Sequence, residues 1–136
     1  MTGVLELPNN KEYVTPGVVQ TGKASSAFAF GDAVLSTDGG ETWDHASGDG
    51  DAGLKGVVLR RGDEDSISSG DIVAVQITGL VVVEATDEVK DGELCILDGS
   101  SPGDVKKGSN TAELSTVFGI TKKGNTTSGD IIVEVL

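Results

Sequence analysis

The chain has 136 residues, a size that suits a single domain able to bury roughly two-thirds of the surface exposed by its unfolded form. Its 22 acidic and 10 basic side chains give a formal net charge of -12, which disfavours nucleic acid phosphates and anionic membranes as partners. With 20 Gly, 3 Pro and only 4% aromatic residues, the composition predicts an all-β protein of short strands joined by tight turns.

No apolar run approaches the roughly eighteen residues that a membrane-spanning helix needs, and the first residues carry no secretion signal. We therefore expect a soluble protein assembled in a cytoplasm. The acidity also suits a high-salt cytoplasm, where screening weakens the repulsion between carboxylates.

Residues 1–26 are expected to form an extended arm, because their apolar side chains follow neither a helical nor a strand period and are interrupted by Pro8 and Pro16. An edge strand with a frayed terminus is the alternative. The candidate partner-binding residues of this arm are its apolar side chains Val4, Leu5, Leu7, Tyr13 and Val14.

Short β-rich runs follow the arm, and several begin with a Gly and an acidic residue. These starts are Gly31-Asp32, Gly70-Asp71, Gly92-Glu93 and Gly129-Asp130. The Gly can adopt the left-handed conformation that a tight turn requires, and we expect the acidic side chain to stay in solvent.

The starts recur at a spacing of about sixty residues, which predicts two copies of one β-unit, 28–80 and 88–136, within a single domain 27–136. The two copies would be joined by residues 80–85. A closed barrel of two pseudo-repeated halves is the simplest fold for this pattern. The pairs of equivalent glycines are Gly31 and Gly92, Gly56 and Gly119, and Gly70 and Gly129.

Strands are expected where β-branched residues gather, and residues 80–83 are expected to be covered on both faces because they do not alternate. Two long loops, 36–53 and 98–112, occupy equivalent positions in the two units. The expected strands are 31–35, 55–60, 72–78, 80–85, 94–97, 117–121 and 131–136.

The first long loop begins with Ser36-Thr37-Asp38-Gly39-Gly40-Glu41-Thr42-Trp43, which resembles the Asp-box of sialidase-like propellers. In that family the motif stabilises a hairpin turn away from the chemistry. We expect only the local consequence here, a hairpin with Trp43 in the core.

No catalytic site is expected, and no cofactor. His45 and Cys95 are the only residues of their kinds and lack evident partners, and Cys95 lies in an apolar run typical of a buried thiol. The carboxylates of 44–51 lack the spacing of a calcium loop, so a solvated acidic loop is expected there rather than a metal site.

Three segments together resemble the small capsid decoration proteins of tailed viruses: Phe30–Val34, Gly56–Leu59 and Gly70–Gly79. The resemblance extends over about residues 17–136. It implies a β-barrel or β-tulip-like domain that sits as a homotrimer on the outer surface of an icosahedral virion. There it would stabilise the head by bridging subunits of the major capsid protein, and its arm could add a strand to a capsid loop.

Two other functions stay open. A carbohydrate-binding or cell-attachment β-module would use Trp43 and the long loops. A biotinyl carrier domain also has two β-halves, but Lys106-Lys107 lacks the apolar neighbours of a carrier lysine.

Overall fold

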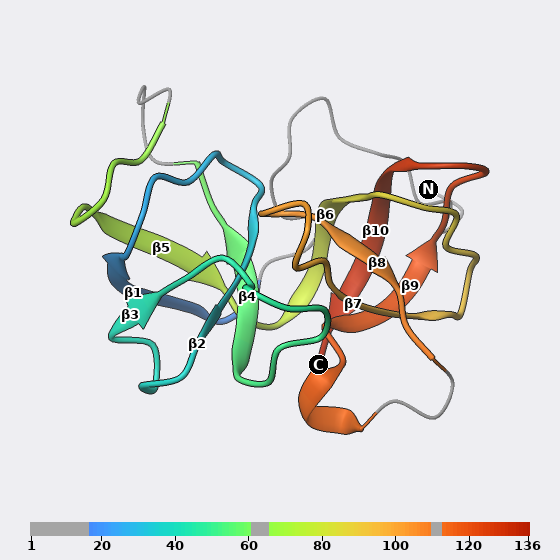
Figure 1. Ribbon diagram of the computed structural model, residues 1–136, viewed down its shortest axis with the longest axis horizontal. Helices are drawn as coiled ribbons and strands as arrows, with labels where there is room; N and C mark the ends of the chain where they lie inside the picture. The colour runs from blue at the N-terminus through green and yellow to red at the C-terminus, as the bar shows by residue number, and fades with distance from the viewer. Residues whose placement is uncertain (1–16, 61–65, 110–112) are drawn as a thin grey trace.

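The structure, a computed structural model, describes residues 17–60, 66–109 and 113–136, and in these residues the fold is all-β (Figure 1). The described residues contain no helix long and apolar enough to cross a membrane. The elements are β1 (Val19–Ala24), β2 (Ala33–Ser36), β3 (Thr42–Trp43), β4 (Leu54–Val58), β5 (Ile72–Gln76), β6 (Gly79–Ala85), β7 (Leu94–Leu97), β8 (Val105–Lys107), the 3-10 helix η1 (Leu114–Thr116), β9 (Gly119–Lys123) and β10 (Gly129–Val135).

The fold consists of two five-stranded units side by side, with β1 to β5 in the first and β6 to β10 in the second (Figure 1). The first sheet has the order β2-β4-β5-β1-β3, and the second is a closed barrel of order β10-β6-β8-β7-β9. Each strand of the first unit has the same neighbours as the strand five places later in the chain. A bridge between Leu35 and Asp44 joins the two ends of the first sheet, as the β7–β8 pairing does in the barrel.

This arrangement confirms the predicted all-β fold with a closed barrel, but each unit forms its own five-stranded sheet, whereas we had expected the two halves to close into one barrel. The unit boundaries differ from the expected ones. Residues 19–24, expected within the arm, form β1 and pair with all of β5, and residues 80–85, expected to connect the units, belong to the first strand of the second unit. The sequence of β1, Val-Gln-Thr-Gly-Lys-Ala, has little β-branched content, so only its pairing with β5 identifies it as a strand.

The predicted equivalence of Gly31 and Gly92 is confirmed by equivalent hydrogen bonds in the two units. The N–H of Gly31 donates to the carbonyl of Val58 at 2.8 Å, and the N–H of Gly92 donates to that of Thr121 at 2.7 Å. Both glycines have positive φ, 88° and 84°, as the third residue of a type II turn requires.

We had expected the acidic residue after each turn glycine to stay in solvent. In three of these turns its carboxylate instead forms a hydrogen bond with the backbone. The carboxylates of Asp32, Asp71 and Glu93 each accept a hydrogen bond from the backbone N–H three residues earlier, at 2.9, 2.9 and 2.7 Å. The Gly-acid pair therefore stabilises the turn in two ways. The glycine adopts the positive φ that the turn requires, and the acid accepts a hydrogen bond from a backbone N–H group that would otherwise lack one.

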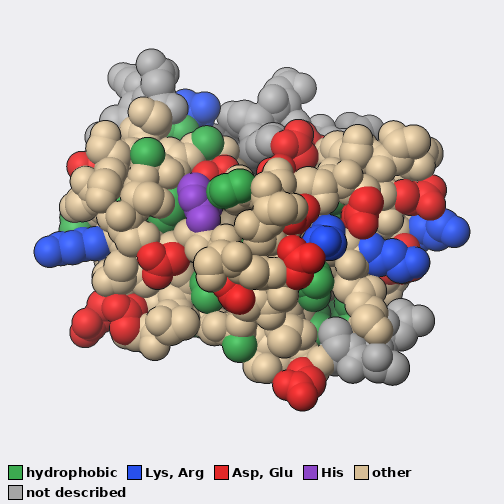
Figure 2. Space-filling model, in the orientation of Figure 1, with side chains coloured by type: hydrophobic (Ala, Val, Ile, Leu, Met, Phe, Trp, Pro, Cys, Tyr) green, Lys and Arg blue, Asp and Glu red, His purple; other side chains and the backbone are tan. Residues whose placement is uncertain are grey.

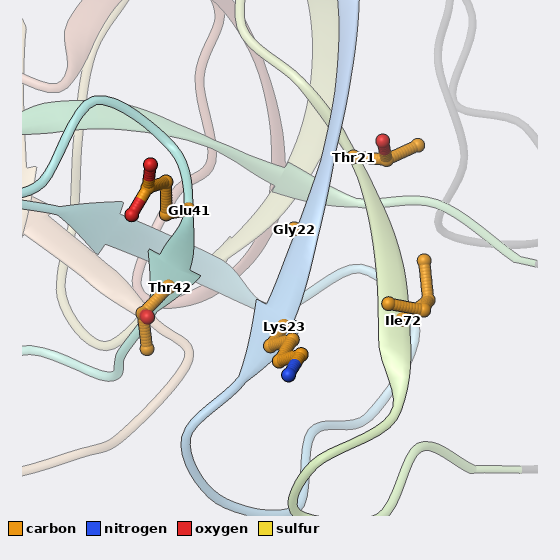
Figure 3. A pocket seen from close by; sticks show the side chains of 6 residues that line it. All are labelled: Thr21, Gly22, Lys23, Glu41, Thr42 and Ile72. Carbon is orange, nitrogen blue, oxygen red and sulfur yellow. The ribbon is translucent and has the colours of Figure 1, made fainter.

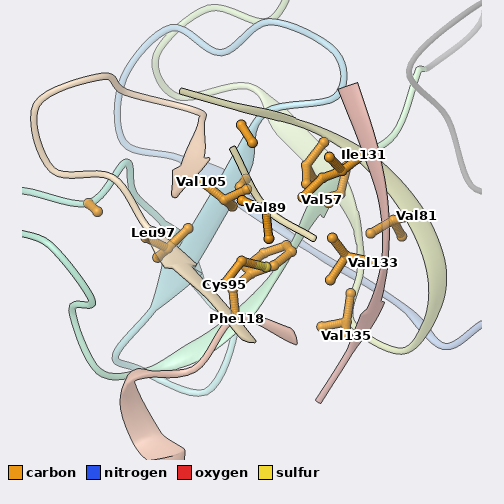
Figure 4. Packing of buried hydrophobic residues seen from close by; sticks show 14 of the residues in the cluster. Val57, Val81, Val89, Cys95, Leu97, Val105, Phe118, Ile131, Val133 and Val135 are labelled. Carbon is orange, nitrogen blue, oxygen red and sulfur yellow. The ribbon is translucent and has the colours of Figure 1, made fainter. Parts of the chain in front are cut away.

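The hydrophobic core has two parts. One cluster fills the first unit: Ala24, Phe28, Val34, Trp43, Val58, Ile67, Val73 and Val75. The other fills the second barrel and continues into the first unit, where it includes Ala33, Leu35 and Val57. Because side chains alternate along β2 and β4, these three residues point away from the first interior and toward the second, and Figure 4 shows Val57 beside Ile131. This second cluster spans both units, and we call it the shared core.

Candidate functional site

The loop after β2 forms the hairpin expected from the Asp-box. The Ser36 hydroxyl donates to Asp38 at 2.7 Å and accepts from the N–H of Gly40 at 2.9 Å. The Asp38 carboxylate accepts from the N–H of Thr42 at 2.9 Å, and this bond, followed by the one from Ser36, lowers the pKa of Asp38. Trp43 is completely buried, so the prediction of a hairpin with Trp43 in the core is confirmed.

The outward side of β1 and β5 carries exposed apolar side chains, and we call it the β1–β5 face. It consists of Val19, Thr21 and Lys23 on β1 and Ile72 and Ala74 on β5, and Thr21 pairs with Ala74 and Lys23 with Ile72. Val19 is 48% exposed and Ile72 is 49% exposed. Val18, which directly precedes β1, is 57% exposed.

A shallow groove of about 490 Å³ runs along the β1–β5 face, as Figure 3 shows. Its lining comes from three elements: Thr21, Gly22 and Lys23 on β1, Ile72 on β5, and Glu41 and Thr42 at β3. The groove exists because β3 is only two residues long and pairs with β1 at Lys23 and Ala24 alone. The remaining length of β1 has no β3 partner, and an extended segment lying in the groove could contact it.

The acidic loop 44–51 joins the two units and is not merely solvated, which corrects our expectation. Asp49 accepts hydrogen bonds from the N–H of Gly99 at 2.9 Å and from the ammonium of Lys106 at 2.7 Å. The bond from Lys106, with that from Gly99, lowers the pKa of Asp49. Asp51 stays within the loop and accepts from the N–H groups of Ser47 and Gly48. The described residues contain no cluster of three or more side chains that could hold a metal ion.

His45 has a partner, contrary to what the sequence suggested. Its Nε2 lies 2.8 Å from Oδ2 of Asp32, and its ring packs edge-on against Phe28 with centroids 4.8 Å apart. Figure 2 shows this single histidine near the boundary between the units. The same Asp32 oxygen accepts the N–H of Ala29. The carboxylate belongs to a Gly-acid turn, which indicates a structural role for the pair.

Cys95 is fully buried, as its apolar run predicted. Burial raises its pKa to about 12, while a hydrogen bond to the carbonyl of Gly119 acts weakly in the opposite direction. The two lysines weighed as carrier sites are both paired with acids: Lys106 with Asp49 and Lys107 with Glu93 at 2.9 Å.

The candidate capsid-binding residues Val4, Leu5, Leu7, Tyr13 and Val14 lie outside the described residues. Sequence reasoning missed the β1–β5 face. The signal that could have found it is the alternation Val19, Thr21, Lys23 at a spacing of two, which is typical of one side of a strand.

No family model matches the chain, and no curated protein matches it. Among solved structures, the chain is similar to the head fiber gp8.5 N base of bacteriophage phi29. The TM-score is 0.48 and the sequence identity is 15%, over 88% of this chain and 97% of that chain.

Proposed function

We propose that this protein is a structural component of a tailed-virus particle that binds and stabilises the outer surface of an icosahedral capsid. It would sit as a homotrimer and bridge subunits of the major capsid protein. The β1–β5 face carries the proposal, because exposed Val19 and Ile72 on a strongly acidic protein indicate a surface that binds another protein. The sequence resemblance to capsid decoration proteins supports the same role.

The architecture suits a protein that binds without catalysis. The shared core and the bonds of Asp49 to the second unit hold both units as one body, so the β1–β5 face is presented with little loss of conformational freedom on binding. The arm could add further contacts through Val4, Leu5, Leu7, Tyr13 and Val14. The net charge of -12 would keep decorated particles dispersed.

Co-sedimentation with purified undecorated capsids tests the proposal. The substitutions Val19→Asp and Ile72→Asp should weaken retention on capsids by about tenfold or more each, because each places a charge in an apolar contact. Leu114→Asp is the matched control, since Leu114 is 74% exposed but lies in η1 of the second unit. Equal retention of all variants, or no retention of the unmodified protein, would contradict the proposal.

A carbohydrate-binding role has less structural support. Its main motivation was Trp43, and a completely buried indole cannot stack on a sugar ring. One observation favours a carbohydrate-binding role: the groove has a polar lining, formed by Thr21, Lys23, Glu41 and Thr42. Binding on a glycan array that is lost in Lys23→Ala would establish this role instead.

A further inference from the structure

The chain contains four Asp-Gly steps, a pair of residues whose backbone can rearrange spontaneously. In this reaction the backbone nitrogen of the glycine attacks the side-chain carboxyl carbon of the aspartic acid. The nitrogen must be able to give up its proton, so a hydrogen bond that holds the glycine N–H in the folded protein protects the step. The four steps are Asp38-Gly39, Asp49-Gly50, Asp91-Gly92 and Asp98-Gly99.

The carboxylates of these four aspartic acids do not distinguish the steps. Each of them accepts a hydrogen bond from a backbone N–H group, at a distance between 2.7 and 2.9 Å. The donors are Thr42 for Asp38, Gly99 for Asp49, Gly124 for Asp91 and Ser100 for Asp98.

The glycine N–H groups do distinguish the steps. The N–H of Gly39 finds no acceptor among the residues that the structure describes, whereas the other three glycines each donate a hydrogen bond. The acceptors are the carbonyl of Leu97 for Gly50 at 2.9 Å, the carbonyl of Thr121 for Gly92 at 2.7 Å, and the carboxylate of Asp49 for Gly99 at 2.9 Å.

Asp38-Gly39 and Asp91-Gly92 form a matched pair. Both steps are exposed, and their glycines have similar positive φ values of 75° and 84°. A Cβ built on either glycine would find no atom within 4 Å. Neither crowding nor the φ angle separates the two steps, so the hydrogen bond on the N–H of Gly92 is the difference that bears on the reaction.

We propose that Asp38-Gly39 is the site at which this protein isomerises aspartic acid to isoaspartic acid as it ages. The nitrogen of Gly39 bonds to Cγ of Asp38, and its proton and the carboxyl hydroxyl leave as water, which gives a succinimide ring. Water then opens the ring at either carbonyl. Opening at Cγ restores aspartic acid, and opening at the main-chain carbonyl leaves the chain running through Cγ, as isoaspartic acid. The sequence of steps is redox-neutral.

The rearrangement alters the Asp-box hairpin. It adds a methylene group to the backbone and places the carboxylate directly on Cα, so the present bonds of Asp38 to Ser36 and Thr42 cannot both persist. These bonds close the hairpin that carries Trp43 into the core, and we expect the isomerised protein to have a lower Tm. The inference concerns the protein by itself and does not rest on the proposed function.

Ageing of the full chain at neutral pH, with and without 8 M urea, tests the proposal. Endoproteinase Asp-N cleaves before aspartic acid but not before isoaspartic acid, so digestion and mass spectrometry measure the isomerisation of each step. In the folded protein Asp38 should isomerise at least about tenfold faster than Asp91, because the bond of Gly92 must open first. In urea, where no such bond protects a step, the four rates should agree within about threefold.

An Asp91 rate in the folded protein that equals or exceeds the Asp38 rate would overturn the proposal. So would an unchanged Asp38 in folded protein under conditions in which the urea-unfolded chain reacts. Gly39→Ala is the control variant, because its methyl group enters open space but hinders the attacking nitrogen, and isomerisation at Asp38 should slow. Unchanged isomerisation in this variant would contradict the proposal. If the positive φ keeps Gly39→Ala from folding, the comparison of Asp38 with Asp91 in the unmodified protein decides.

Discussion

The indole of Trp43 and the carbonyl of Gly40 occupy the space that any side chain at position 22 would need: a Cβ built on Gly22 would collide with the Gly40 carbonyl oxygen and would lie 2.9 Å from both Cδ1 and Nε1 of Trp43. In the second barrel the pairing of Ala85 with Val105 matches that of Ala24 with Trp43, so Val105 stands where the first unit has Trp43. The equivalent of Gly22 there is Val83. A large and a missing side chain in the first unit thus replace two valines in the second.

We therefore expect substitutions at Gly22 and Trp43 to have coupled effects on the free energy of unfolding. Gly22→Val should destabilise the protein by about 1–3 kcal/mol through overpacking, and Trp43→Val by about 3–5 kcal/mol through the cavity it leaves. The double variant removes the clash with the indole but keeps the one with the Gly40 carbonyl, so it should lose less than the sum of the two. Urea unfolding measures all three. Additive losses would show that the two positions do not share one space.

The bond between Asp49 and Lys106 predicts a loss of stability in acid. The pKa of Asp49 is lowered in the folded protein by its bonds to Lys106 and Gly99, so its contribution is present above the unfolded pKa of about 4 and disappears as the pH falls through the folded value. Lys106→Gln should therefore be less stable than the unmodified protein at pH 7, and the difference should shrink toward pH 2. Unfolding curves at both values check this. A difference independent of pH would contradict it.

Because the Cys95 thiol is buried, we expect it to react slowly with alkylating reagents. With a pKa of about 12 and no exposed surface, Cys95 should not react with iodoacetamide at pH 8 over hours in the native protein, and should react within minutes in 8 M urea. Intact mass measured over time gives both rates. Rapid modification without denaturant would mean that β7 opens readily.

The side chain of Lys55 is a buried cation, and its surroundings allow a prediction about the stability of the protein. Its ammonium donates to the carbonyls of Gly53, at 2.8 Å, and Ser115, and so ties β4 to η1 of the second unit. Burial lowers its pKa.

Lys55→Met keeps the methylene contacts and removes the buried charge, so we expect it to change stability by less than about 1 kcal/mol at pH 7. Because a charged lysine with a lowered pKa opposes folding, the unmodified protein should gain stability toward pH 10 relative to Lys55→Met. Lys55→Ala, which also loses packing, is the control and should cost about 2 kcal/mol. A Lys55→Met variant as unstable as Lys55→Ala would show that the two hydrogen bonds dominate.

The parts of the fold that the sequence predicted are those governed by local chemistry. Gly31 and Gly92 mark turns because their backbone angles favour glycine, and Trp43 was located by a hairpin motif. The parts that it did not predict depend on contacts between distant residues. β3 and β8, of two and three residues, exist only through their neighbours, and the partners of Asp49 and His45 come from other segments of the chain. The β1–β5 face was missed for the same reason, since β1 is a strand only because β5 pairs with it.

The shared core has a consequence for self-association. Ala33, Leu35 and Val57 on the outside of one unit pack against the interior of the next, which is a head-to-tail contact between unlike surfaces. A single unit that carried both surfaces could bind further copies of itself, because such contacts need not close into a ring. Fusing two units satisfies one contact within the chain, and Trp43 fills the corresponding interior of the first unit. In the first unit Trp43 therefore fills interior space, whereas the second barrel's cluster includes residues of its neighbour.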